Sequence, residues 1–241
     1  MPIGFWVVTL VSQAAIVPLI AWWARRYAGM SVTWALRIAA ILVVWQGLAI
    51  ALALSGVFAP RPGGPPIIGL AVFVPIVVGA FVLLRSPERA PEASLAVLMG
   101  LQLLRVVGFE FVVAGRGGLL PVLFAAPAGW GDALIGVTAP LVALAVARRV
   151  RGWREIAVVW NIAGIADLAN AVFLGVTSSP GALQLFGGEP STALMTCLPL
   201  SLIPTFGVPL AVLGHIAALR ALRSTSAKVT SAHESGAAQG V

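Results

Sequence analysis

Four ionisable side chains lie inside long apolar stretches of this sequence: Arg105, Glu110, Asp132 and Asp167. An unpaired charge near the centre of a membrane helix costs at least about 2.5–3.5 kcal/mol, so such residues face the protein interior and mark an ion or substrate site or a buried ion pair. Three carboxyl groups against one guanidinium leave excess negative charge in a poorly solvated place. Protonation or a bound cation would relieve it, so this set of residues suits proton coupling or cation binding.

Helical geometry predicts which of these side chains can meet. At 100° per residue, Arg105 shares a face with Gln102 and Phe109, whereas Glu110 points about 140° away. Arg105 is therefore expected to reach a carboxylate on another helix. We favour Asp132 over Asp167 as its partner, because the helices that carry residues 105 and 132 are joined by a short loop.

Asp132 lies in a stretch of small residues. Those that share its helical face are Gly129, Gly136, Ala139 and Ala143. Small residues let membrane helices approach closely, so Asp132 is expected to face protein. Pro127, Gly129 and Gly131 are expected to loosen or break the helix. A restart at Pro127 would put Asp132 in the first turns, where the helix dipole favours a carboxylate.

Asp167 also has small and polar neighbours on its face: Ala163, Gly164, Asn170 and Ala171. Asn170, three residues on, could hydrogen-bond the group that Asp167 binds. The helices carrying Asp132 and Asp167 are joined by a short loop, and their small-residue faces are expected to meet. Asn161 and Gln102 complete the polar candidates within the spans.

The elements that must position these residues are membrane helices. The chain is 60% hydrophobic and 10% charged, against about 25% charged in soluble domains. Apolar runs of about 20 residues cross a hydrocarbon core of about 30 Å. Seven such spans are predicted, at roughly 3–24, 35–57, 66–84, 94–114, 122–147, 155–176 and 193–219. We expect an all-α, seven-helix membrane domain over residues 1–223 and a disordered, Ser/Ala/Gly-rich cytoplasmic tail over 224–241.

Basic residues alternate from loop to loop. Twelve fall on one side: Arg25, Arg26, Arg37, Arg85, Arg89, Arg148, Arg149, Arg151, Arg154, Arg220, Arg223 and Lys228. Only Arg61 and Arg116 fall on the other side. The positive-inside rule then predicts an external N-terminus and a cytoplasmic C-terminus in the plasma (inner) membrane. Anionic lipid headgroups account for the net charge of +7, so no nucleic-acid partner is expected.

Short internal matches suggest a duplication. "VPIVVGAFVLLR" from Val74 resembles "VPLAVLGHIAALR" from Val208, and "VVWQ" at Val43 resembles "VVWN" at Val158. They pair span three with seven and span two with six, as in a parallel three-plus-one-plus-three repeat. This architecture resembles that of the seven-helix SWEET transporters, although the proline-glutamine signature of that family is missing. The chain is also similar to bacterial seven-helix membrane proteins of unknown function.

The last predicted span contains three prolines spaced five residues apart. They are Pro199, Pro204 and Pro209 in "PLSLIPTFGVP". Prolines are tolerated in membrane helices where neighbours satisfy the freed carbonyls. They indicate either a broken helix that lines a cavity or ordinary kinks.

These patterns favour a small-molecule or ion permease, for which the carboxyl groups would suit proton coupling. The alternative is a membrane-embedded sensor or assembly protein with a structural ion pair. A remote alternative is an intramembrane aspartyl protease, because "GWGD" at Gly129 resembles the GxGD motif of presenilin-type proteases. No Ser–His dyad, HExxH or P-loop motif is present, and Cys197 is the single cysteine, so we expect no enzyme activity, metal or cofactor.

Overall fold

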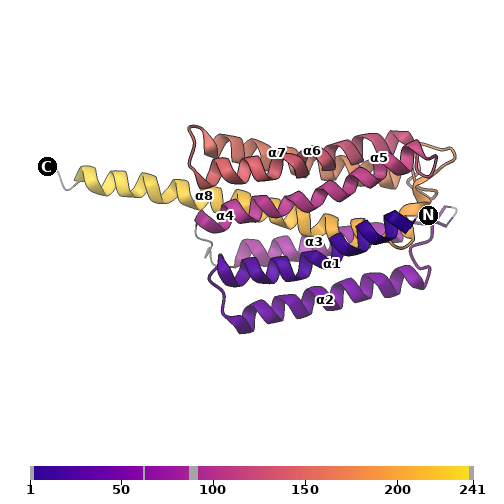
Figure 1. Ribbon diagram of the computed structural model, residues 1–241, viewed down its shortest axis with the longest axis horizontal. Helices are drawn as coiled ribbons and strands as arrows, with labels where there is room; N and C mark the ends of the chain where they lie inside the picture. The colour runs from indigo at the N-terminus through magenta and orange to yellow at the C-terminus, as the bar shows by residue number, and fades with distance from the viewer. Residues whose placement is uncertain (1–2, 62, 87–91, 239–241) are drawn as a thin grey trace.

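The computed structural model describes residues 3–61, 63–86 and 92–238, with side chains described for 3–61, 63–86 and 94–223. This part of the chain is all-helical and has no strand. It contains seven helices that are long and apolar enough to cross a membrane. They lie side by side in one bundle (Figure 1). The predicted all-α, seven-helix membrane fold is confirmed.

The first three spans are continuous helices: α1 (Ile3–Arg26), α2 (Val32–Leu54) and α3 (Ile67–Arg85). Ser31 caps α2, because its side chain accepts a hydrogen bond from the Trp34 backbone N–H at 3.3 Å. Large apolar side chains on the outer faces are exposed, as with Val44 on α2 at 71% and Val77 on α3 at 65%. Such faces suit contact with lipid.

The fourth span changes its helical type in the middle. It consists of α4 (Glu92–Gly100), the 3₁₀ helix η1 (Leu101–Gly108) and α5 (Phe109–Arg116). A 3₁₀ helix has three residues per turn, so residues three apart share a face. Gln102, Arg105 and Gly108 accordingly all lie on the buried side. Phe109, which α-helical spacing placed beside Arg105, is instead exposed.

The fifth and sixth spans are α6 (Val122–Ala147) and α7 (Trp153–Thr177). The prediction that Pro127 breaks the helix is wrong, because α6 runs through it without interruption. One missing backbone hydrogen bond close to the helix start is tolerated. Asp132 therefore lies ten residues into α6, about 15 Å along its axis, and not in the first turns of a new helix.

The seventh span begins later than predicted. A 3₁₀ turn, η2 (Thr192–Thr196), precedes it, and the span itself starts with the π-helix η3 (Ile203–Gly207) and continues as α8 (Val208–Ala238). Pro199 therefore precedes the span, whereas Pro204 and Pro209 lie within it. Side chains from 224 onward and residues 239–241 lie outside the described part, so the disordered tail stays a prediction.

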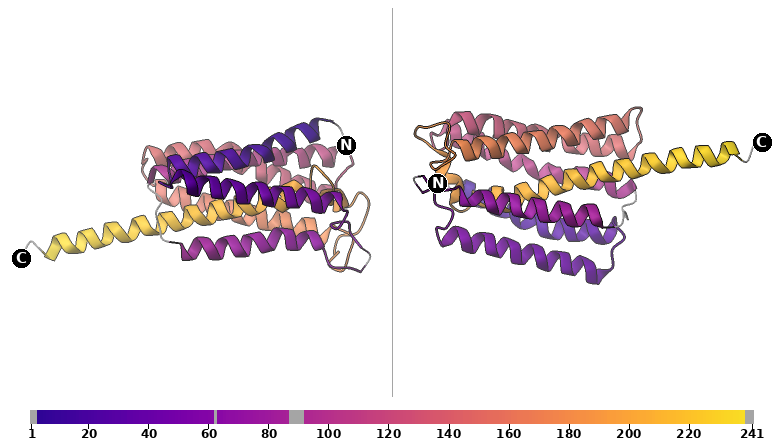
Figure 2. Two further views of the ribbon diagram at one scale, coloured as in Figure 1. Left: turned by 90° about the horizontal axis from the view of Figure 1, so that it is seen from below. Right: turned by 180° about the vertical axis from the view of Figure 1, so that it is seen from behind.

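The two ends of the bundle differ in charge. The basic end contains the loop 27–31, the end of α3, the loop 148–152 and the emerging α8 (Figures 1 and 2). The opposite end contains the start of α1 and the connections 55–61, 63–66, 117–121 and 178–202. Arg220 of α8 donates a hydrogen bond to the Ser86 carbonyl after α3. The alternation of basic residues thus corresponds to two real ends, while the membrane side of each end and the three-plus-one-plus-three repeat stay predictions.

Three apolar clusters fill the described part of the bundle: one joins α1, α2 and η3, and the other two lie on either side of its middle. The first of these two, towards the opposite end, includes Phe111, Phe124 and Leu200. The second, which we call the basic-half core, includes Met99, Ile135, Ala139, Ala157 and Leu222. A polar layer lies between them.

Candidate functional site

Arg105 is the centre of this polar layer. Its Nε donates a hydrogen bond to Asp132 Oδ1 at 2.8 Å, and its Nη2 donates to Asp167 Oδ2. Its Nη1 contacts the Gly164 carbonyl at 3.3 Å and His215 Nε2 at 3.2 Å. Side chains from three other spans therefore converge on the guanidinium of Arg105, a residue that is 6% exposed. The predicted pairing of Arg105 with Asp132 is present, and Asp167 shares the same guanidinium.

His215 extends this network to α7. A guanidinium can only donate hydrogen bonds, so His215 Nε2 must accept and Nδ1 must carry the proton. Nδ1 then donates to Asn161 Oδ1 at 2.8 Å. The Asn161 amide donates in turn to the Ala157 carbonyl at 2.7 Å. His215 and Asn161 are both fully buried, and one tautomer satisfies the whole chain of contacts.

Glycines make room for the buried charges. A Cβ atom at Gly131 would overlap the Asp167 carboxylate, and one at Gly108 would overlap Asp132. A Cβ at Gly164 would overlap the His215 ring. At Gly136 it would lie 2.7 Å from the Val106 backbone nitrogen of η1. Glycine at these four positions therefore allows the helices to approach until the charged groups touch.

The small-residue face of α6 has a different partner from the one expected. Gly129 and Gly136, on the Asp132 face, pack against Val112 and Val106 of the fourth span. The face was expected to meet α7. It is Gly131, next to Asp132 in the chain, that faces α7 and its Asp167. Asp132 therefore points towards the fourth span, which explains why Arg105 reaches it so directly.

The predicted group of three carboxylates is divided in two. Glu110 points away from Arg105, as helical spacing indicated, and its Oε2 accepts a 2.5 Å hydrogen bond from Thr9 on α1. The site proper, which we call the Arg105 cluster, contains Arg105, Asp132, Asp167, His215 and Asn161. With both aspartates ionised, its two carboxylates and one guanidinium carry one net negative charge.

The other predicted site residues occupy different surroundings. Gln102 is buried one 3₁₀ turn from Arg105, and its amide donates to the Ala211 carbonyl of α8 at 3.1 Å. It helps to attach η1 to α8. Asn170 is exposed on α7 and has no described hydrogen bond to the cluster. Asp167 itself is half-buried, with a side chain 16% exposed.

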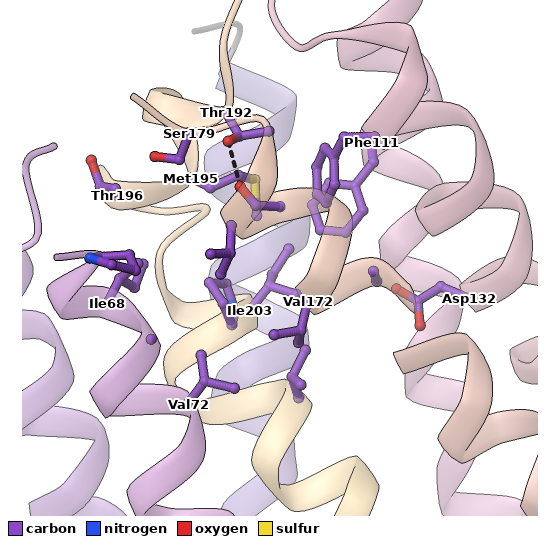
Figure 3. A pocket seen from close by; sticks show the side chains of 18 residues that line it. Ile68, Val72, Phe111, Asp132, Val172, Ser179, Thr192, Met195, Thr196 and Ile203 are labelled. Atoms are coloured by element: carbon purple, nitrogen blue, oxygen red, sulfur yellow. Dashed lines mark hydrogen bonds between the residues drawn. The ribbon is translucent and has the colours of Figure 1, made fainter. Parts of the chain in front are cut away.

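A pocket leads from the opposite end to this cluster. Residues of α3, α6, α7 and η3 line it, and it reaches Asp132 at its inner end (Figure 3). Phe111, Phe124, Val172 and Ile203 are among its apolar lining residues. Near the outer part, the Thr192 hydroxyl donates to the Gly175 carbonyl at 2.7 Å (Figure 3). The pocket therefore joins an apolar cavity to one carboxylate of the Arg105 cluster.

Sequence reasoning missed His215 and Thr9. In the predicted span over 193–219, position 215 falls near the end that is flanked by basic residues. Because the real span runs over Ile203–Arg223, His215 lies close to its middle. A signal was available, since a neutral histidine and a buried asparagine are natural partners for a guanidinium in a poorly solvated place. Thr9 gave no such signal.

One protein-family model matches the later spans of the chain. Residues 65–223 match a domain of unknown function, DUF8737. The chain belongs to this family. The match covers α3 to the end of the seventh span, including the whole Arg105 cluster and the pocket, whereas α1 and α2 precede it. Neither a curated protein nor a solved structure matches the chain.

Proposed function

We propose that this integral membrane protein is a small-molecule or ion permease of the bacterial plasma membrane, and not an enzyme. One observation carries the proposal: an apolar pocket reaches from one end to mid-depth and ends at Asp132, in a cluster with excess negative charge. Ionisable residues that line a cavity in the middle of a membrane protein are typical of ion and substrate pathways.

The two halves of the bundle differ as a carrier requires. The half towards the opposite end contains the pocket, whereas the basic-half core fills the other half with apolar side chains. A permease would alternate between this arrangement and one open towards the basic end. Irregular helix is in the right place for such a movement, because η1 carries Arg105 and η3 borders the pocket. Proton coupling through Asp132 or Asp167 would belong to the same cycle.

A static role is the second candidate. The described contacts use four of the five N–H donors of Arg105, as expected of an ion pair that only holds helices together. A sensor or assembly protein would then offer the pocket to a ligand without opening the basic half.

Cysteine accessibility separates a carrier from a static protein without knowledge of the substrate. Cys197 is exposed and is first replaced by Ser. Val172→Cys then reports on the pocket, and Met99→Cys, at a position 1% exposed, reports on the basic-half core. Each variant is treated with a membrane-impermeant thiol reagent in vesicles of either orientation.

We expect Val172→Cys to react from the opposite end and Met99→Cys to react, more slowly, from the basic end. Leu134→Cys on the lipid-facing side of α6, where residue 134 is 65% exposed, is the control and should resist the polar reagent from both sides. Labelling of Val172→Cys alone would contradict alternating access and favour the sensor or assembly role.

A further inference from the structure

We propose that the pocket binds an amphipathic organic cation: an ammonium group at Asp132 attached to a small apolar, preferably aromatic, body. This inference rests on the proposed function, since it names the ligand class of the same pocket. It follows from the shape of the pocket, the charge of the Arg105 cluster and the aromatic side chains between them.

The pocket lining has one charged group among the described residues, and that group is at the inner end. Asp132 holds this position, while most of the remaining lining is aliphatic or aromatic. In Figure 3, Asp132 lies at one edge of the group of lining residues. The hydroxyls of Ser179, Thr192 and Thr196 lie at the other end of the pocket. A ligand that satisfies this lining has one polar end and an apolar body.

The sign of the polar end follows from the charge of the cluster. Asp132 uses Oδ1 to bind Arg105, and Arg105 also binds Asp167, so one guanidinium serves two carboxylates. A cation at Asp132 would balance the remaining negative charge, whereas an anion would add to it. Buried charge that lacks a partner is unfavourable, so the cluster selects a positive ligand.

Aromatic side chains favour an organic cation over a bare metal ion. Phe111 and Phe124 both line the pocket, with ring centroids 5.4 Å apart and planes tilted by 47°. Aromatic faces attract ammonium groups and pack against apolar bodies. A metal ion would need several oxygen ligands, and Asp132 is the one carboxylate in the described lining.

The experiment compares two probes of nearly equal shape. Binding of 2-phenylethylammonium and of neutral 2-phenylethanol to the purified full-length protein in detergent is measured by calorimetry at pH 7. We expect the ammonium to bind at least ten times more tightly than the alcohol. Equal affinities would overturn the proposal and indicate a purely apolar pocket, such as one occupied by a lipid chain. Absence of binding by both probes would overturn it too.

Two variants locate the binding. Asp132→Asn should remove the preference, bringing the two affinities within about twofold of each other. Val172→Phe, which fills the pocket without touching the Arg105 cluster, should weaken both probes at least tenfold. Leu134→Ala on the lipid-facing side of α6 is the matched control and should change neither affinity. An ammonium preference that survives both pocket variants would place the cation elsewhere and contradict the proposal.

Failure of this inference is distinguishable from failure of the proposed function. If the ammonium binds at Asp132 but Met99→Cys never reacts from the basic end, the ligand class stands and the permease does not. If Met99→Cys reacts but the ammonium shows no preference over the alcohol, the permease stands and the ligand class is wrong.

Discussion

Gly131 on α6 lies directly against Asp167 on α7, so that a Cβ atom at position 131 would occupy the space of the carboxylate. This contact determines how closely the two helices pack beside Arg105. Glycine is required here because α6 is a regular helix and cannot move its backbone away locally.

Gly131→Ala is expected to displace Asp167 from Arg105 and to destabilise the protein by about 1–3 kcal/mol, as overpacking does in well-packed interiors. Thermal unfolding in detergent measures the effect. Gly47→Ala on α2 is the matched control, because no atom outside its own stretch of helix lies within 4 Å of the added Cβ. Equal unfolding temperatures for the two variants would show that the contact between Gly131 and Asp167 is not tight.

Arg105→Gln is expected to lower the free energy of unfolding by about 3–5 kcal/mol, because it leaves the buried Asp132 carboxylate and the half-buried Asp167 carboxylate without their partner. Adding Asp132→Asn to it removes one of these charges and should recover part of the loss. Arg61→Gln, at an exposed position of the opposite end, is the control and should stay within about 0.5 kcal/mol of the wild type. A double variant as unstable as the sum of the single variants would rule out the coupling between Arg105 and Asp132.

Thr9→Val is expected to destabilise the attachment of α1 by about 1–3 kcal/mol, because Glu110 loses its described hydrogen-bond donor. Thr9→Val with Glu110→Leu replaces both partners by apolar groups and should be closer to the wild type than Thr9→Val alone. Ser12→Ala is the control, since the Ser12 hydroxyl bonds only the Thr9 carbonyl of its own helix among the described contacts. Additive losses in the double variant would contradict a direct interaction. Chemical denaturation in mild detergent provides the measurement.

The orientation in the membrane is tested by reporter fusions. Reporters after Lys228 and within 148–154 should be cytoplasmic, because the basic end is retained on the side of anionic lipids. Reporters near Gly63 and Gly187, at the opposite end, should be external. A cytoplasmic signal at Gly187 would contradict the orientation, and so would an external signal within 148–154.

The sequence by itself determined the seven spans. A helix must be long and apolar to cross a membrane, and both properties can be judged for each segment without knowledge of its neighbours. It also identified Arg105, Asp132 and Asp167, since a charge in an apolar run is visible without neighbours. The pairing of Arg105 with Asp132 followed from adjacency in the chain, and the separation of Glu110 from Arg105 followed from helical angle.

Only the tertiary structure decided how these side chains combine. The 3₁₀ form of η1 changes which residues accompany Arg105, and it arises where the fourth span is packed against α6 and α8. Two aspartates and His215 contact the same guanidinium, and these contacts join positions up to 110 residues apart in the chain. The start of the last span at Ile203, which brings His215 to mid-depth, depends on where that segment meets its neighbours. Local periodicity contains no information on such contacts, because each one is a relation between helices and not a property of any single helix.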